Sequence, residues 1–80
     1  MRILDKETDK TLKDIILLLT VNEASELRDS LESILKGIDY MQHEHINDIG
    51  FEHEISIVLY NYTEINSFDK RIRKLILNDE

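Results

Sequence analysis

The chain has 80 residues, a net charge of −7 at neutral pH, no cysteine and no proline. A chain of this length has room for one hydrophobic core, so we expect a single domain over residues 1–80. Without cysteine there is no disulfide framework, no thiolate zinc site and no cysteine nucleophile. The longest apolar run, Ile15–Leu19, is too short to span a membrane, so we expect a cytoplasmic protein that does not associate with membranes.

The acidic excess is confined to one internal segment of the chain. Between Gly37 and Asp69 there is no Lys or Arg, and the remaining residues hold ten acids and ten bases. Nucleic-acid binding needs clustered basic side chains, so we expect no nucleic acid and favour a basic protein surface as the partner. The acids of this segment are Asp39, Glu44, Asp48, Glu52, Glu54, Glu64 and Asp69.

Two strands are predicted at the beginning of the chain, over Met1–Lys6 and Leu12–Thr20. The polar stretch Glu7–Lys10 lies between them and suits a hairpin connection.

A helix is predicted from the residue after Thr20 to Gly37. Thr20 and Glu23 have the spacing of a capping box, in which each side chain accepts from the backbone N–H of the other residue. Glu23 in the first turn and Lys36 in the last turn complement the helix dipole. Apolar side chains recur at helical spacing and define one face: Val21, Ala24, Leu27, Leu31, Ile34 and Leu35.

The second half of the chain predicts two more strands, His43–Asn47 and Glu52–Tyr62, and a last helix. Asn66 or Ser67 is expected to cap this helix, which runs to about Asn78. The predicted order is ββαββα. We therefore expect an α+β domain with an antiparallel or mixed four-stranded sheet and two helices packed on it.

The long strands are apolar on both faces, although a sheet covered on one face should alternate apolar and polar residues. If both helices cover the same face, the other face carries an apolar patch, which on a soluble protein usually marks an interface. We expect this patch to make the protein a homodimer or higher oligomer. The alternative is that the helices lie on opposite faces and bury both. The patch consists of Ile16, Leu18, Val58, Tyr60 and Tyr62.

Three histidines lie in the acidic segment, and His43 and His45 should point to the same face of their strand. Together with His53 and Asp48 they are a possible ligand set for zinc or another divalent ion. The interpretation that we favour is that they are partly exposed polar residues whose pKa values are raised by neighbouring carboxylates.

The last helix carries the chain's one basic cluster, Lys70, Arg71, Arg73 and Lys74. We expect it in the last two turns, where positive charge is favourable against the helix dipole. The cluster is either a solvated helix face or a site for an anion such as phosphate, assisted by stacking on Tyr60 or Tyr62. Leu77 is anomalous, because it falls on the polar side with Lys70 and Arg73.

No residue pattern indicates catalysis. Ser25, Ser30 and Ser33 have no glycine-rich elbow around them, and there is no phosphate-binding glycine loop. We therefore expect a non-enzymatic binding protein without cofactor that acts by occluding a partner through the apolar patch and the acids Glu44, Asp48, Glu52 and Glu54.

Immunity proteins, antitoxins and phage-encoded inhibitors of host defence share this profile of a short acidic domain without an active site. The amino-acid usage resembles that encoded by AT-rich bacterial or phage genomes. Two alternatives stay open. One is an oligomeric sponge that sequesters a nucleotide or another small anionic ligand, and the other is a histidine-based metal-binding protein.

Overall fold

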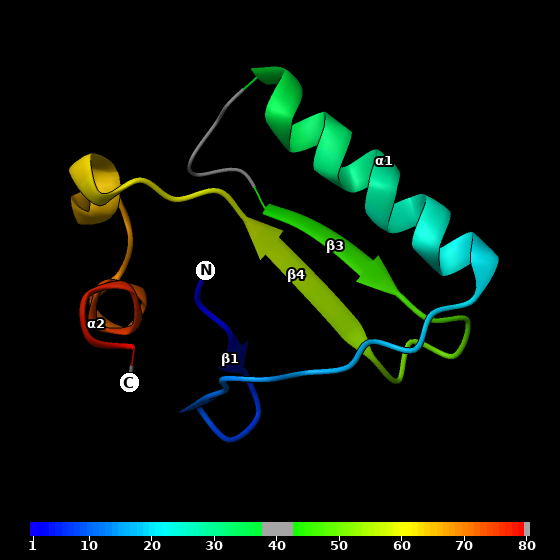
Figure 1. Ribbon diagram of the computed structural model, residues 1–80, viewed down its shortest axis with the longest axis horizontal. Coiled ribbons are helices and arrows are strands. Elements are labelled where there is room, and N and C mark those ends of the chain that lie inside the picture. Colours follow the sequence, from blue (N-terminus) through cyan, green and yellow to red (C-terminus); the bar gives the residue numbers. More distant parts are fainter. Residues whose placement is uncertain (38–42, 80) are drawn as a thin grey trace. The chain divides into compact units, whose positions relative to one another are not determined.

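A computed structural model describes residues 1–37 and 43–79, which form two compact units. The terminal unit contains Met1–Leu17 and Asn61–Glu80, so it joins the two ends of the chain. The central unit contains Leu18–Tyr60. Figure 1 shows the elements of each unit in the colours of the sequence.

The protein is α+β, with two α-helices and two separate two-stranded antiparallel sheets. The predicted single four-stranded sheet with ββαββα packing is not confirmed, because among the described strands β1 pairs with β2, and β3 with β4, in separate sheets. The elements are β1 (Leu4–Asp5), β2 (Lys10–Thr11), α1 (Val21–Gly37), β3 (His43–Asn47), β4 (Glu54–Val58), the 3-10 helix η1 (Tyr62–Ser67) and α2 (Lys70–Asn78).

The predicted strand Leu12–Thr20 is wrong: residues 12–20 belong to no helix or strand. Ile16 and Leu18 are 85% and 89% exposed. An apolar run becomes a strand only where a neighbouring strand supplies ladder hydrogen bonds and a packing surface, and residues 12–20 pair with none of the described strands. The expected strand Met1–Lys6 is likewise reduced to the two residues of β1.

The predicted apolar sheet face is therefore not formed. Of its five residues only Val58 lies in a strand. Ile16 and Tyr62 belong to the terminal unit, whereas Leu18, Val58 and Tyr60 belong to the central unit.

Helix α1 begins and ends where the sequence predicts, and its capping box is formed. The Glu23 carboxylate accepts from the Thr20 N–H at 2.9 Å, and the Thr20 hydroxyl oxygen accepts from the Glu23 N–H at 3.2 Å. Two of the helix's first N–H groups, which have no partner within the helix, are thereby satisfied.

Helix α1 packs against β3 through one edge of its apolar face (Figure 1). Ile34 of the helix and Ile46 of the strand are 2% and 4% exposed and form the core of this unit. The other edge of the apolar face is uncovered, and its residues at helical spacing are exposed: Val21, Ala24, Leu31 and Leu35.

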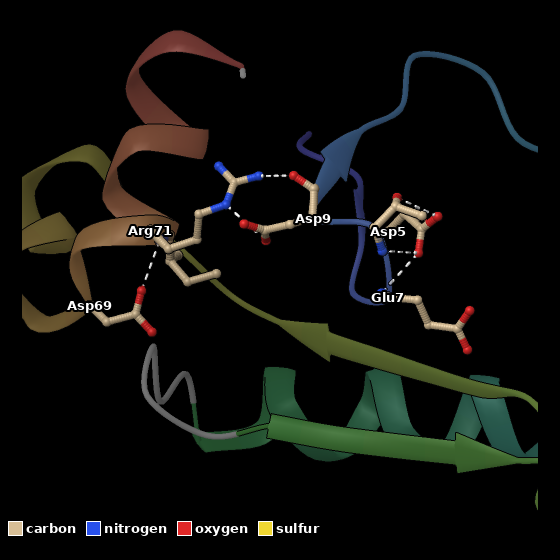
Figure 2. A network of polar contacts seen from close by, with 7 residues as sticks. Asp5, Glu7, Asp9, Asp69 and Arg71 are labelled. Atoms are coloured by element: carbon tan, nitrogen blue, oxygen red, sulfur yellow. Dashed lines mark hydrogen bonds and ion pairs between the residues drawn. The ribbon is translucent and has the colours of Figure 1, made fainter.

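In the terminal unit, β1 and β2 form a short hairpin whose turn is held by Asp5. Its carboxylate accepts from the Glu7 N–H at 3.0 Å and from the Thr8 hydroxyl at 2.8 Å (Figure 2). The Thr8 hydroxyl, followed by the Glu7 N–H, lowers the pKa of Asp5 below its ordinary value. Asp9 completes the turn with a left-handed φ of 61°, which Asp tolerates better than most residues.

Helix α2 begins later than expected. Its N-cap is Asp69, whose carboxylate accepts from the Ile72 N–H, and neither Asn66 nor Ser67 caps it, since both lie in η1. Its C-cap Asp79 is left-handed. The buried apolar side chains of the unit are Phe68, Leu75 and Ile76.

Within the described ranges 1–37 and 43–79, none of the helices is both long and apolar enough to cross a membrane.

Because the capping box satisfies two helix N–H groups, we expect Thr20→Ala to lower the free energy of unfolding by about 0.5–2 kcal/mol. Thr20→Ser keeps the accepting hydroxyl and is the matched control. Denaturant titrations followed by far-UV circular dichroism measure both variants. Equal stability of Thr20→Ala and Thr20→Ser would show that the Thr20 hydroxyl does not contribute.

Candidate functional site

The β3–β4 hairpin has two different faces, which its register defines. Ile46 lies opposite Ile55, and Glu44 lies opposite Ile57, so these side chains share a face. Glu44 accepts from the Ser33 hydroxyl of α1 at 3.0 Å, which identifies this face as the one covered by the helix. The other face is mostly polar and carries His43, His45, Asn47, Glu54, Ser56 and Val58.

Of the three histidines, only His43 and His45 share a face as predicted, with ring centroids 6.1 Å apart. Nδ1 of His45 lies 2.8 Å from Oε1 of Glu54 and 2.8 Å from the Ser56 hydroxyl. His53 instead contacts Asp48 in the turn. In the part of the chain that the structure describes, no three His, Asp or Glu side chains are placed to hold a metal ion.

Asp48 organises the turn between β3 and β4. Its Oδ1 accepts from the Glu52 N–H at 2.8 Å and the His53 N–H at 3.2 Å, and its Oδ2 lies 2.5 Å from Nδ1 of His53. The His53 ring and these N–H groups lower the pKa of Asp48, and the same ion pair raises the pKa of His53. The favoured prediction of a raised histidine pKa is thus confirmed for His53.

Two large apolar side chains stand at the tip of this turn, and the sequence analysis missed them. Ile49 is 99% exposed and Phe51 is 77% exposed. Phe51 also has a left-handed φ of 54°, which is an outlier for a bulky residue and costs on the order of 1–3 kcal/mol. An isoleucine and a phenylalanine around Gly50, in an otherwise hydrophilic turn, were the available signal.

The four acids predicted to bind a partner differ in how far they are already engaged. Glu44, Asp48 and Glu54 contact Ser33, His53 and His45 respectively. Glu52 is exposed, and its carboxylate makes no hydrogen bond or ion pair with a described residue. Glu52 is therefore the member of the set whose charge is most available.

The predicted basic cluster is divided by the structure. Arg71 is turned toward the β1–β2 turn, where its Nε lies 2.9 Å from the Asp9 carboxylate and its terminal nitrogen donates to the Asp9 carbonyl at 2.5 Å (Figure 2). Lys70, Arg73 and Lys74 line an open hollow of about 390 Å³ within the terminal unit.

The prediction that the cluster lies in the last two turns of the helix is wrong. Lys70 is the first residue of α2, so the cluster occupies its N-terminal half, where positive charge opposes the dipole. Tyr60 and Tyr62, the predicted stacking partners, are not among the described residues that line the hollow. Tyr60 belongs to the central unit, and the side chain of Tyr62 is outside the described part of the chain.

No protein-family model, curated protein or solved structure matches the chain. Two features of the described residues bear on function. One is the apolar tip with its acidic neighbours, and the other is the basic hollow along α2.

The Asp48–His53 pair predicts the titration of His53. A raised pKa in the folded state means that the pair stabilises the turn at low pH and that this contribution is lost as pH rises through the folded pKa. For Asp48, whose pKa is lowered, the contribution is lost as pH falls through its folded pKa. The turn is therefore most stable at mildly acidic pH, between the two values.

We expect NMR titration of the His53 ring to give a pKa above about 6.5, the usual value for imidazole. Asp48→Asn keeps an oxygen acceptor for the backbone N–H groups but removes the charge, and should lower the His53 pKa toward that value. Glu26→Gln on α1 is the control and should leave it unchanged. A wild-type pKa of 6.5 or less would contradict the ion pair.

Proposed function

We propose that the protein is a non-enzymatic, cytoplasmic binding protein that occludes a basic surface of a partner protein through the tip of its β3–β4 hairpin. The carrying observation is the exposure of Ile49 and Phe51 at a turn flanked by Asp48 and Glu52. This combination of an apolar centre and a charged rim is the usual composition of a protein–protein contact.

The exposed apolar tip lowers the stability of the protein when no partner is bound. Ile49 and Phe51 leave large apolar surfaces in water, and burying one such side chain contributes roughly 1.5–3 kcal/mol. Phe51 adds a strained backbone conformation. Strain of this kind persists where its surroundings enforce it, and here the Asp48 hydrogen bonds hold the turn. A turn fixed in advance also loses little entropy on binding.

The charge of the central unit supports a basic partner. Leu18–Tyr60 contains nine acidic and two basic side chains and so accounts for the whole net charge of −7. Such a field accelerates encounter with a positively charged surface and acts less on the lifetime of the complex. An inhibitor of the immunity-protein, antitoxin or phage anti-defence type would use this steering to reach its target before competing ligands.

Affinity capture from host lysate with paired baits tests the role of the tip. Ile49→Ser/Phe51→Ser should weaken capture of the partner by roughly 30-fold, which corresponds to about 2 kcal/mol for a hot spot. The matched control is Ile16→Ser/Leu18→Ser, which removes two equally exposed apolar side chains elsewhere. Loss of the partner with the control but not with the tip variant would overturn the proposal.

The role of the charge is tested with Glu52→Lys, compared with Glu26→Lys on the outer side of α1. Both variants change the net charge equally, but only Glu52 belongs to the turn that carries Ile49 and Phe51. We expect Glu52→Lys to slow association with the captured partner and to reduce its salt dependence more than Glu26→Lys does. Surface plasmon resonance at several ionic strengths measures both. Equal effects would mean that the acids only keep the protein soluble.

We further propose that the protein forms a homodimer, now through α1 rather than through a sheet face. The uncovered edge of α1 exposes Val21, Leu31 and Leu35, with side chains on one side of a 17-residue helix. Two such helices packed antiparallel would bring the Glu23 end of one beside the Lys36 end of the other, which matches their charges and dipoles.

Leu35→Glu should therefore convert the dimer to a monomer of 9.5 kDa without loss of helix signal, because Leu35 is 58% exposed and not core. Sedimentation velocity measures the oligomeric state of both proteins. A protein concentration of about 0.1 mM is needed, because an interface smaller than the standard size associates weakly. Leu77→Glu, 56% exposed on α2, is the control. A monomeric wild type would refute the proposal of a homodimer through α1. It would not affect the proposal that the tip of the β3–β4 hairpin binds a partner.

A further inference from the structure

The hollow along α2 has the size of a small-ligand site. Its volume of about 390 Å³ falls in the range of roughly 300–1,000 Å³ that is usual for such sites. It is lined by side chains of η1 and α2, both of which belong to the terminal unit. One copy of the chain therefore supplies the whole hollow.

The charge lining the hollow has one sign. Lys70, Arg73 and Lys74 line it, and no acid is among its described lining residues. None of the three forms an ion pair with a described residue. Because they lie in the N-terminal half of α2, their charges add to the positive end of the dipole instead of balancing it. Helix stability thus gives no reason for their position.

Arg73 supplies a second observation, a donor for which the described residues provide no acceptor. Its Nε is buried and has no hydrogen-bond partner among the described residues. A buried donor without an acceptor costs free energy, since it has lost its water without replacement. The Nε of Arg71, two residues away, is buried as well, but a carboxylate oxygen of Asp9 lies 2.9 Å from it (Figure 2). An acceptor from outside the chain would satisfy this donor once the guanidinium turns toward the hollow.

The rest of the lining is suited to an organic group. Ile65 and Leu77 contribute apolar surface, and Asn66 and Asn78 contribute amides. Leu77 is the residue that is anomalous in the helical pattern, since it lies on the basic side of α2. Its place in the hollow, where it is 56% exposed, gives that side an apolar contact surface.

We propose that this hollow binds a small phosphorylated organic molecule of the nucleoside monophosphate class. The phosphate oxygens accept from the Arg73 guanidinium and from the ammonium groups of Lys70 and Lys74, since Arg and Lys are the usual partners of phosphate. The organic part lies against Ile65 and Leu77. The terminal unit has eight acids and eight bases, so the site does not lie in the strongly acidic unit.

Titration with AMP and with inorganic phosphate, followed by amide NMR shifts and calorimetry at low ionic strength, tests the proposal. We expect saturable binding of AMP that shifts the amides of η1 and α2 and weakens with added salt. Arg73→Gln and Lys74→Gln should each weaken AMP binding about tenfold or more, as for lost hydrogen bonds between charged groups. Lys74 is exposed, so its variant does not endanger folding.

Matched controls remove equal charge from α1: Arg28→Gln and Lys36→Gln should bind AMP as the wild type does. Absence of saturable AMP binding at millimolar concentration, or equal weakening by the control variants, overturns the proposal. Leu77→Ser should weaken AMP binding but not phosphate binding. Equal effects on both would overturn the role of the organic part. Ile49→Ser/Phe51→Ser should bind AMP as the wild type does. The AMP experiment therefore tests the hollow independently of the proposal for the hairpin tip.

Discussion

The scarcity of buried apolar surface governs this structure. Among the described residues, five apolar side chains are buried, and they are divided between the two units: Ile34 and Ile46 in the central unit, and Phe68, Leu75 and Ile76 in the terminal unit. A two-stranded hairpin alone is marginal in water, and α1 must cover its apolar face. With cores this small, polar contacts between residues distant in sequence have to fix much of the remaining geometry.

The terminal unit illustrates this dependence. Arg2 donates through Nε to the carbonyl oxygens of Leu75 and Ile76 at 3.1 and 3.0 Å, which joins the beginning of the chain to the C-terminal turn of α2. Lys13 pairs with the C-cap Asp79, which lowers the pKa of that carboxyl. Exposed ion pairs contribute little singly. The Arg2 bonds are different, because they reach carbonyl groups in the last turn of α2. The Leu75 carbonyl also accepts from the Asp79 N–H, whereas that of Ile76 is among those that a helix end leaves without a partner in the helix.

The sequence predicted those features that depend on residues close together in the chain, and it failed where a distant residue is needed. The ends of α1 were predicted correctly, because a capping box and a glycine act within a few residues of each end. The prediction of a strand over Leu12–Thr20 was wrong, because strand formation depends on a pairing strand that no local sequence pattern reveals. For α2, three neighbouring residues could each act as the N-cap. Asp69 is the N-cap in the structure, whereas Asn66 and Ser67 lie in η1. Composition alone does not decide among such neighbours.

The candidate sites follow the same division. The residues of the basic cluster were recognised, but the separation of Arg71 from Arg73 depends on Asp9, which is remote in sequence. The acids of the hairpin were recognised too, whereas the role of Asp48 in holding the turn required the structure. The apolar tip was overlooked because the sequence shows two hydrophobic residues in a hydrophilic turn but does not show that both are exposed.

Among the described residues, each candidate site contains one local cost that the rest of its unit does not compensate. In the central unit it is the left-handed, exposed Phe51, and in the terminal unit it is the buried Nε of Arg73 without an acceptor. Sequences generally agree with their folds at every level, and exceptions concentrate where function requires them. The two features favour opposite chemistry, since the tip lies in the unit with all the net negative charge, whereas the hollow is lined by basic side chains. A basic protein surface and a phosphorylated small molecule would therefore occupy different units of one chain without competing for the same residues.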